Sequence, residues 1–535
     1  MKKTKRGDQE LNQTDLKQYG QEYPFLPVIV SKKISNFDPV VLMQELGTTQ
    51  DQTMIFQREG VTTFFLSLEQ TITGRDGQIQ VTSADGSVKT QQGDPIAFLN
   101  QLYRQYKIPK VTDTIPFVAG LIGYFAYDFV RYHPDVHLAP AQDDLGLADF
   151  ELFLPKVVAN YRHETKELIL SQTVASNRLE TDFEKVQQEL NDLADQAGEI
   201  MDRIPGNDLA AAKQENQDSF NHESLEEDET QSQPARTFNE SLKGDEIESQ
   251  SALTFTNQFT RAAFSDRVQI TKEHIHAGDI FQLILSNPYL AKTDNQQLLL
   301  GVFTRLQAGP QSPYQFYFQN GDYQATGASP ETLIKKTGDR LFSYPLAGTR
   351  RRGKTAEEDH FFAQELQHSE KELAEHNMLV DLGRNDLGRV SQFGTVAVTK
   401  LRHLLYFPNV MHLGSTIESR AQADLTPVDI LAATLPAGTL SGAPKISAMQ
   451  IINQLEDRKR GIYGGGIGTI GFDGDLDICI GIRLAYQKDQ HLVVHAGAGI
   501  VADSSPEEEY REFENKSRLM LDLVTKEAAA DAITN

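Results

Sequence analysis

The sequence predicts an α+β fold. Segments with the alternating pattern and the β-branched and aromatic residues of strands are interspersed with segments of helical spacing. The two kinds do not alternate regularly, as they would around a parallel sheet, so α+β layers are expected. The composition, with 39% hydrophobic and 24% charged residues in a chain of 535, is that of an ordinary globular protein.

A smaller N-terminal unit is expected over residues 20–200. Residues 53–68 predict two strands around a glutamate–glycine turn, and 157–161 with 168–171 predict a hairpin. Helical spacing follows over 181–197. The unit therefore has strands and a helix of its own.

An acidic segment, residues 205–250, follows this unit. It contains twelve acidic and three basic residues, few large apolar residues and no sustained periodicity. Such a segment cannot bury enough apolar surface to offset the entropy lost on ordering, so a disordered linker is predicted. A solvated spacer is the simpler interpretation, and an acidic docking tail is the alternative.

A larger C-terminal unit is expected over residues 255–525, with a strand-rich last third and no internal repeat. Its predicted helices lie at 265–277, 356–382 and 506–526. Its predicted strands lie at 280–285, 341–345, 466–472, 478–486 and 491–496.

Charge and cysteine content exclude several classes of function. The formal net charge of −24 repels nucleic acid and anionic membranes, so neither is an expected partner. The most apolar stretch, 116–127, is too short to span a bilayer, and the basic residues 1–6 are not followed by the apolar run of a secretory signal. The single cysteine, Cys479, lies in an apolar strand. It fits a reducing, cytoplasmic compartment and a buried structural thiol rather than a glutaminase nucleophile.

Three short motif matches are set aside because of their context. Residues 348–355 match a P-loop, but three consecutive arginines would crowd a phosphate cradle. The glycines of 466–471 match a dinucleotide fingerprint but lie within a predicted strand with no helix after it. Residues 473–484 begin like a calcium loop but lack its sixth-position glycine and twelfth-position glutamate, so a hairpin turn is predicted.

Two pairs of glutamates are candidate metal ligands. Glu372 and Glu375 are three residues apart on one predicted helix, and Glu509 and Glu512 on another, so each pair projects from one helical face. For either pair alone, a solvated acidic face is the simpler interpretation. Both pairs lie near turn-forming and basic residues, however, and facing pairs would offer the oxygen ligands that Mg²⁺ prefers.

Glycine clusters and two cations complete a candidate anion site. The glycine-containing segments 347–349, 436–445 and 496–499 would let backbone amides approach a ligand. Arg483 is a lone charge in an apolar strand, so it is either paired with a carboxylate in the core or directed at an anionic ligand. Lys445 is the second candidate cation. The chemistry implied is a metal-held carboxylate substrate with general acids nearby.

Eight segments together resemble the chorismate-utilising enzymes, and within them component I of the anthranilate synthases. They are AGDIFQLILS (277–286), GASPETL (327–333), YPLAGTRRRG (344–353), AEHNMLVDLGRNDLGRV (374–390), VMHLGST (410–416), PAGTLSGAPKISAM (436–449), RGIYGGGIGTIGFDGDLDICIGIR (460–483) and AGAGIVADSSPEEEY (496–510). The resemblance is strong over 255–525 and weak over 20–200. It implies two packed β-sheets surrounded by helices. It also implies a Mg²⁺-dependent lyase that converts chorismate and ammonia to anthranilate and pyruvate in tryptophan biosynthesis.

The resemblance also implies roles for particular residues. Glu375 and Glu512 would hold Mg²⁺, with Glu372 and Glu509 close behind, and the metal would bind the ring carboxylate of chorismate. The residues implied to bind chorismate are Gly348, Thr349, Tyr463, Arg483, Gly497, Ala498, Gly499 and Lys516. Thr439 and His412 would lie near the enolpyruvyl group.

Acid–base chemistry points to one further residue. The 4-hydroxyl of chorismate leaves only when protonated, so a carboxylic acid must lie beside it. Glu331, in the S-P-E segment, is the expected acid, with its pKa raised by an enclosed site. Ammonia then adds at C2, and loss of pyruvate and of the C2 proton makes the ring aromatic. His412 or a neighbouring residue is expected to assist these proton transfers.

Two positions separate the activities within this family. Isochorismate and salicylate synthases carry a water-activating lysine where this chain has Gln282, which cannot act as a base. Aminodeoxychorismate synthases of folate biosynthesis often carry a nucleophilic lysine where this chain has Ala347, and they are the alternative function. Because no plausible glutaminase cysteine is present, ammonia is expected from a separate glutamine amidotransferase, component II.

A regulatory tryptophan site is the last expectation from the resemblance. Anthranilate synthases usually bind tryptophan through an L-L-E-S segment and a P-Y-[ML] segment that meet in space. The second is partly present as Pro313, Tyr314 and Gln315, with glutamine at the apolar position. The first aligns with 54–59, where Arg58 stands in place of the serine. Tryptophan is therefore expected to inhibit weakly, unless Arg58 points to solvent and another residue binds the ligand.

Overall fold

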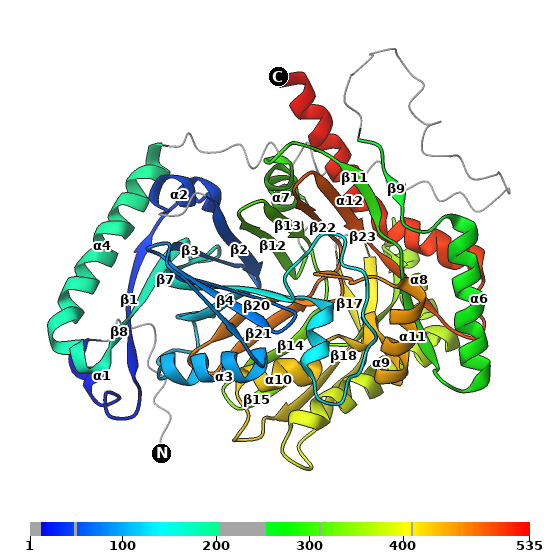
Figure 1. The fold of residues 1–535 in the computed structure, drawn as a ribbon, viewed down its shortest axis with the longest axis horizontal. Helices are drawn as coiled ribbons and strands as arrows, with labels where there is room; N and C mark the ends of the chain where they lie inside the picture. The colour runs from blue at the N-terminus through cyan, green and yellow to red at the C-terminus, as the bar shows by residue number, and fades with distance from the viewer. Residues whose placement is uncertain (1–11, 48–50, 204–252, 310–311, 408–409, 535) are drawn as a thin grey trace.

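The computed structural model describes residues 12–47, 51–203, 253–309, 312–407 and 410–534. The segment predicted to be a linker, 205–250, lies outside these described residues. Strands and helices occur along the whole of the described chain, with helices on the outside of the strands (Figure 1). The α+β prediction is confirmed, whereas the division into two units stays a prediction.

Within the described ranges, the strands form two antiparallel sheets, one of twenty-one strands and one of three. The strands of the large sheet are β1 (Phe25–Lys33), β2 (Gln52–Arg58), β3 (Val61–Arg75), β4 (Gln78–Ser83), β5 (Val88–Gln92), β6 (Gly120–Phe125), β7 (Phe150–Arg162), β8 (Glu167–Ala175), β9 (Thr256–Asn257), β11 (Tyr289–Lys292), β12 (Tyr314–Asn320), β13 (Tyr323–Gly327), β14 (Thr332–Thr337), β15 (Arg340–Ser343), β16 (Leu346–Arg351), β17 (Ala397–Tyr406), β18 (Val410–Arg420), β20 (Gly466–Gly471), β21 (Leu476–Ile480), β22 (Leu484–Lys488) and β23 (His491–His495). Those of the small sheet are β10 (Gln282–Ser286), β19 (Gly442–Ala443) and β24 (Gly497–Ile500).

Helices surround these sheets, and α4 lies along β1 and β8 at one end of the molecule (Figure 1). The helices are α1 (Gln13–Lys17), α2 (Pro39–Leu46), α3 (Pro95–Tyr106), α4 (Leu179–Arg203), α6 (Arg261–Ala277), α7 (Leu298–Ala308), α8 (Ala356–His368), α9 (Glu370–Val390), α10 (Pro427–Thr434), α11 (Lys445–Glu456) and α12 (Pro506–Thr534), with short 3₁₀ turns η1 (Tyr127–Tyr132), η2 (Ser176–Arg178) and η3 (Gly438–Leu440). None of the helices in the described ranges combines the length and apolar composition needed to cross a bilayer.

Strands from both sides of the 205–250 segment are interleaved in the large sheet. Strand β2 lies between β3 and β12, with Phe56 opposite Phe316. Strand β6 pairs with β20, where Gly123 faces Gly468. One apolar cluster therefore combines Met54 and Phe56 with residues of the C-terminal half, such as Cys479. Removing this shared apolar surface from water favours keeping the two halves together.

Two predicted elements prove to be broken in the middle. The helix expected over 356–382 is two helices, because Ser369 ends α8 and its hydroxyl accepts a hydrogen bond from the Glu372 amide at the start of α9. The strand expected over 478–486 is interrupted between β21 and β22, where Arg483 adopts a φ of +51°. Both breaks lie at residues that matter for the site.

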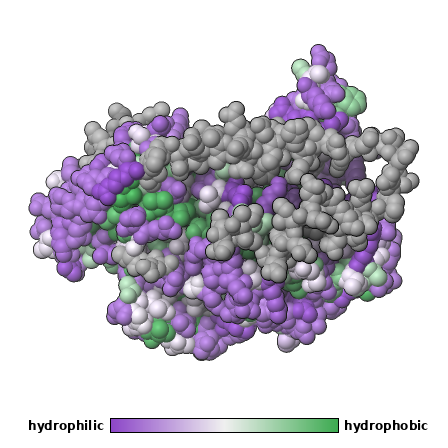
Figure 2. All heavy atoms as spheres, turned by 90° about the horizontal axis from the view of Figure 1, so that it is seen from above, coloured by the Kyte–Doolittle hydropathy of each residue, from purple (hydrophilic) through white to green (hydrophobic). Residues whose placement is uncertain are grey.

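The other predicted strands and turns are confirmed. Strands β2 and β3 meet at a turn in which Glu59 and Gly60 both have positive φ, and β7 pairs with β8 as a hairpin. The rejected P-loop begins inside β16, and the rejected calcium loop begins in the turn between β20 and β21. Among the coloured residues, Figure 2 shows this face of the molecule as mostly hydrophilic, with hydrophobic residues gathered mainly in one band.

Candidate active site

Arg483 is an enclosed cation at the break between β21 and β22. Burial lowers the pKa of its guanidinium, and the nearby Tyr463 opposes that effect. Its side chain forms no ion pair or hydrogen bond within the described part of the chain, although the backbone carbonyl of Arg483 accepts a bond from the Ala328 amide at 3.1 Å. The sequence left two interpretations of Arg483, a carboxylate partner in the core or an anionic ligand. No carboxylate partner is found among the described residues. The arrangement fits an anionic ligand.

Tyr463 and the glycines of β24 lie beside this cation. The Tyr463 ring stacks on His495 with 4.1 Å between centroids. A Cβ at Gly497 would lie 2.8 Å from the Tyr463 hydroxyl, so only glycine allows this approach. Strand β24 pairs with β10, and a Cβ at Gly499 would lie 2.9 Å from Nε2 of Gln282. Gln282, which stands where a water-activating lysine was considered, is therefore next to the predicted substrate-binding glycines.

Glu331, the predicted acid, is held between two segments of the site. Thr439 donates a hydrogen bond of 3.1 Å to Oε1 of Glu331. The Glu331 carbonyl accepts a bond from the Ile480 amide at 3.0 Å, which places the S-P-E loop against the end of β21. Burial raises the pKa of Glu331 to about 7, although the Thr439 bond and the charge of Lys516 lower it. The predicted rise in pKa is confirmed.

His412 adjoins Gly348 and Thr349 across strands β16 and β18. Nδ1 of His412 lies 3.0 Å from the Gly348 carbonyl and 3.0 Å from the Thr349 hydroxyl. Because a carbonyl can only accept, Nδ1 carries the hydrogen and Nε2 keeps its lone pair. Burial and the charge of Arg483 lower the pKa of His412, which favours this neutral form. The ring is thus able to accept a proton at Nε2.

Helices α9 and α12 bring the four predicted metal ligands to one end of the site. Burial and the charges of Glu372 and Glu512 raise the pKa of Glu375. Burial also raises the pKa of Glu509, with a further contribution from Glu512. The charge of Glu512, on α12, thus acts on Glu375, on α9, so these two carboxylates lie near each other. A Cβ at Gly348 would lie 2.9 Å from Oε2 of Glu372, so this acidic region adjoins the turn near His412.

The carboxylates fit a hard divalent cation in their chemistry. Oε2 of Glu509 is buried and has no hydrogen-bond partner among the described residues, whereas its Oε1 accepts a bond from Ser504 at 2.6 Å. Glu372 pairs with Arg350 at 3.1 Å and Glu512 with Lys516 at 2.6 Å. As the side chains are placed, no three acidic, histidine or cysteine residues in the described ranges stand close enough to hold an ion. The metal role therefore stays a prediction.

Two of the charged residues have structural partners instead of open positions. Lys445 is not a free cation, because its Nζ is 2.7 Å from Asp386, with which it forms a partly buried ion pair. Arg350, which the sequence analysis did not single out, bridges Glu365 and Glu372 and so links α8 to α9. Its only signal in the sequence is its place in the run of three arginines.

The two segments of the expected regulatory site do meet in space, and Tyr314 adjoins the loop that carries Glu331. The Tyr314 amide donates to the Ser329 carbonyl at 3.1 Å, and its hydroxyl lies 2.9 Å from that of Thr332. Arg58 on β2 lies opposite Tyr314 on β12. Arg58 does not point to solvent, since it is 3% exposed and forms an ion pair of 2.8 Å with Asp477. The Tyr314 hydroxyl also donates to Asp477, at 2.9 Å, and Gln315 donates to the Leu306 carbonyl at 2.9 Å. Pro313 directly precedes this strand.

Comparison with known proteins agrees with this geometry. The sequence profile of the chorismate binding enzymes matches residues 52–522, which includes every candidate site residue above. The chain belongs to the chorismate binding enzyme family. The family match begins in β2 and ends in α12, so it covers the interleaved strands on both sides of the 205–250 segment.

Several members of this family are similar over most of their length. Anthranilate synthase component 1 of Acetivibrio thermocellus is 34% identical over 445 residues, which are 83% of each chain. That of Thermus thermophilus is 38% identical over 429 residues, 80% of this chain and 82% of its own. The crystal structure of anthranilate synthase component I from Streptococcus pneumoniae superposes with a TM-score of 0.64 at 30% identity, covering 91% of this chain and 97% of the other. A menaquinone-specific isochorismate synthase of Escherichia coli, at 19% identity and a TM-score of 0.59, shares the fold.

Proposed function

We propose that this protein is component I of an anthranilate synthase, which converts chorismate and ammonia to anthranilate and pyruvate in tryptophan biosynthesis. The observation that supports it most directly is the acid Glu331, with a pKa of about 7, on a loop that is hydrogen-bonded to the segment of the unpaired cation Arg483. An acid still protonated near neutral pH can protonate a departing hydroxyl, and a guanidinium binds carboxylates.

Different side chains of the site bind the substrate, donate a proton and accept a proton. Arg483, Tyr463 and the amides of 497–499 bind the carboxylate groups of chorismate. Glu331 gives its proton to the 4-hydroxyl, which leaves as water while ammonia forms a bond to C2. The new ammonium group loses a proton, which restores the acid. The C2 proton is then removed as the C3–O bond breaks, which gives the aromatic ring and enolpyruvate, and protonation of the enolpyruvate at its methylene carbon gives pyruvate. Nε2 of His412 is the proposed acceptor of the C2 proton, because its lone pair is free.

Mg²⁺ is part of the same proposal. Glu375 and Glu512 would hold it, with Glu372 and Glu509 behind them. When bound, it supplies positive charge that fixes and polarises the ring carboxylate. The buried, unpartnered Oε2 of Glu509 and the like charges around Glu375 support a cation here.

Ala347 and Gln282 argue for this member of the family over the others. Ala347 is buried in β16 and offers no amine for a covalent intermediate, so aminodeoxychorismate synthase is not favoured. Gln282 is buried in β10 and offers no base to activate water. Free ammonia at C2 is the remaining nucleophile.

A separate glutamine amidotransferase, component II, would supply that ammonia. Burial raises the pKa of the Cys479 thiol, and the side chain is 0% exposed, so it cannot act as the nucleophile of a glutaminase. A lone, buried cysteine also agrees with a reducing compartment, and we place the enzyme in the cytoplasm.

The deciding experiment is product identification. The purified chain is incubated with chorismate, Mg²⁺ and ammonium, and anthranilate is followed by its fluorescence and confirmed by mass spectrometry. Anthranilate and pyruvate in equal amounts are expected. Glutamine should support turnover only after an amidotransferase partner is added. Aminodeoxychorismate or isochorismate as the main product would overturn the proposal.

A further inference from the structure

A buried ion pair that none of the proposed steps uses lies behind the active site. Nε and Nη2 of Arg460 donate to the two carboxylate oxygens of Glu456, at 2.7 and 2.6 Å. The side chains are 2% and 4% exposed. Arg460 follows α11, whose last residue is Glu456. Two charges enclosed in this way are costly to bury, so their further bonds are informative.

The remaining donors of Arg460 reach the wall of the site that carries the acid. Nη1 donates to the carbonyl of Leu440 at 2.6 Å. Leu440 directly follows Thr439, whose hydroxyl holds Glu331. Arg460 thereby fixes the backbone turn from which the hydrogen bond to Glu331 is made.

The same pair holds the wall that carries the substrate-binding glycines. Nη2 of Arg460 also donates to the Ile284 carbonyl at 2.8 Å, and Glu456 accepts from the Ser286 amide at 2.8 Å. Both bonds are to β10, in which Ile284 is paired with Gly499 and Ser286 with Gly497. The ion pair thus sets the position of β24 through β10.

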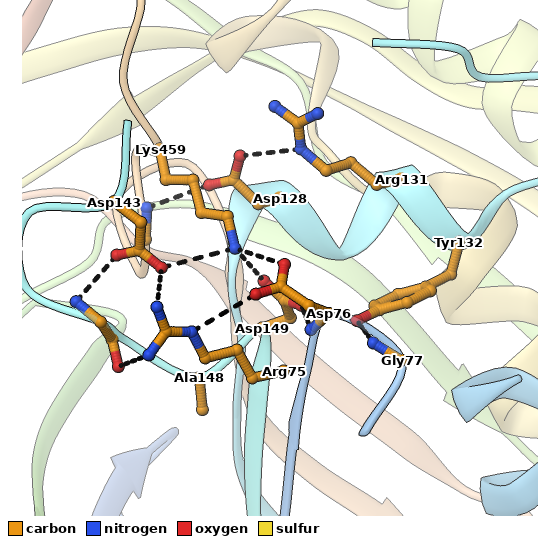
Figure 3. A network of polar contacts seen from close by, with 12 residues as sticks. Arg75, Asp76, Gly77, Asp128, Arg131, Tyr132, Asp143, Ala148, Asp149 and Lys459 are labelled. Atoms are coloured by element: carbon orange, nitrogen blue, oxygen red, sulfur yellow. Dashed lines mark hydrogen bonds and ion pairs between the residues drawn. The ribbon is translucent and has the colours of Figure 1, made fainter. Parts of the chain in front are cut away.

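A third wall, Tyr463, packs on the guanidinium itself. The central carbon of Arg460 is 5.9 Å from the centroid of the Tyr463 ring and 4.6 Å from that of Tyr127. The backbone amides of Arg460 and Gly461 both donate to Asp128. Asp128 also pairs with Arg131 (Figure 3). Asp128 therefore anchors the start of the turn that leads to Tyr463.

We propose that the Arg460–Glu456 pair positions the active site. It fixes Thr439, Tyr463 and the backbone of residues 497–499 relative to one another. A planar guanidinium has enough donors, in fixed directions, to bind a carboxylate and two carbonyls at once, which lysine does not. This proposal rests on the proposed function only where the test measures anthranilate as the product. Binding of chorismate to the protein tests the same positioning without it.

The test separates positioning from stability. Arg460→Lys keeps a charge opposite Glu456 but cannot reach both carbonyls. The double variant Arg460→Met with Glu456→Gln removes both buried charges, which avoids leaving either one unpaired. The matched control is Arg162→Met with Glu167→Gln, an ion pair in the β7–β8 hairpin outside the site.

We expect the Arg460 variants to lose about a hundredfold in kcat, because small displacements of positioned groups are costly. The KM for chorismate should rise as well, and its Kd measured by titration calorimetry should rise in parallel. The double variant should have the melting temperature of the wild type but not its kcat or KM, while the control keeps both kinetic constants.

Wild-type kcat and KM in the folded double variant would overturn the proposal. A kcat loss that follows the melting temperature with an unchanged Kd would also do so. Failure of the wild type to make anthranilate, with chorismate binding still lost in the variants, would count against the proposed function alone.

Discussion

Glu331 acquires its proposed function from its surroundings. Burial raises its pKa to about 7, and Thr439 and Lys516 prevent a larger rise because they stabilise the carboxylate. The sequence could predict this acid from its motif and the need to protonate a hydroxyl. It could not predict how far the pKa moves, since the partners are far apart in the chain: Thr439 is 108 residues from Glu331.

The pH dependence of the reaction is the first prediction. Glu331 acts while protonated, so with free ammonia kept constant kcat should fall as the pH rises through about 7. Thr439→Val removes a bond that lowers this pKa, so the decline should move to higher pH. Glu331→Gln should lower kcat by about 10²- to 10⁴-fold and abolish the decline. A pH profile of kcat for the three proteins checks this. An unmoved profile in Thr439→Val would contradict the assignment.

Arg58 stands where the expected tryptophan site has a serine, and the sequence did not decide where its side chain points. From the sequence it could face solvent or occupy the regulatory pocket. In the structure its ion pair with Asp477 and its 3.2 Å bond to Thr469 put it in the core. A buried guanidinium that is already paired offers a neutral amino acid no partner in the way a serine hydroxyl would.

Weak inhibition by tryptophan is the second prediction. Without a hydrogen-bond partner at this position, affinity should be roughly ten- to a hundredfold below that of a site with the serine. A titration of anthranilate formation with tryptophan measures it, and Arg58→Ser combined with Asp477→Asn should strengthen inhibition. Full inhibition of the wild type at low micromolar tryptophan would show that the pocket is elsewhere.

The burial of Arg460 could not be predicted from the sequence. A glutamate and an arginine four residues apart, at a helix end, look like a solvent-exposed pair. Only the fold turns them inward, because β10, η3 and Tyr463 close around them. Arg483 was easier to single out, since a lone charge in an apolar strand is already unusual in the sequence.

At the scale of elements, the position of the first glutamate pair, Glu372 and Glu375, depends on where helix α9 begins. Helix α9 starts after Ser369, whose hydroxyl caps the Glu372 amide, so the first glutamate pair lies in its first two turns. The sequence predicted helix here from its spacing. It missed the break because helical periodicity continues across residue 369, and the cap is a local hydrogen bond that competes with that pattern.

Loss of the metal site is the third prediction. Glu375→Gln and Glu512→Gln each remove a ligand charge while keeping the shape of the side chain, so activity should fall close to background and its dependence on Mg²⁺ should weaken. Thermal stability without metal should change little, because neither residue is in the core. Activity against Mg²⁺ concentration and melting curves check this, with Glu508→Gln on the same helix as control. Near-wild-type activity in both variants would refute the site.

At the scale of the whole molecule, the chain pairs strands that are far apart in sequence. Local pattern predicted some of the strands and helices, such as β2, β7 and α12, but not which strands pair, because pairing of β2 with β12 spans more than 250 residues and leaves no local signal. The two units expected from the 205–250 segment are therefore not visible as separate sheets. Both supply strands to the same one.

Interdependence of the two halves is the last prediction. Residues 253–535 alone would expose Phe316 where β2 is missing and the edge of β20 where β6 is missing. An exposed apolar edge strand promotes aggregation, so this fragment should be insoluble or inactive when produced by itself. Produced together with residues 1–203, it should assemble into an active enzyme, because the bonds and apolar contacts of β2 and β6 need no covalent connection through 204–252. Solubility, size-exclusion chromatography and anthranilate formation measure the outcome. A soluble, active 253–535 fragment would mean that the catalytic residues are held in place without β2 and β6.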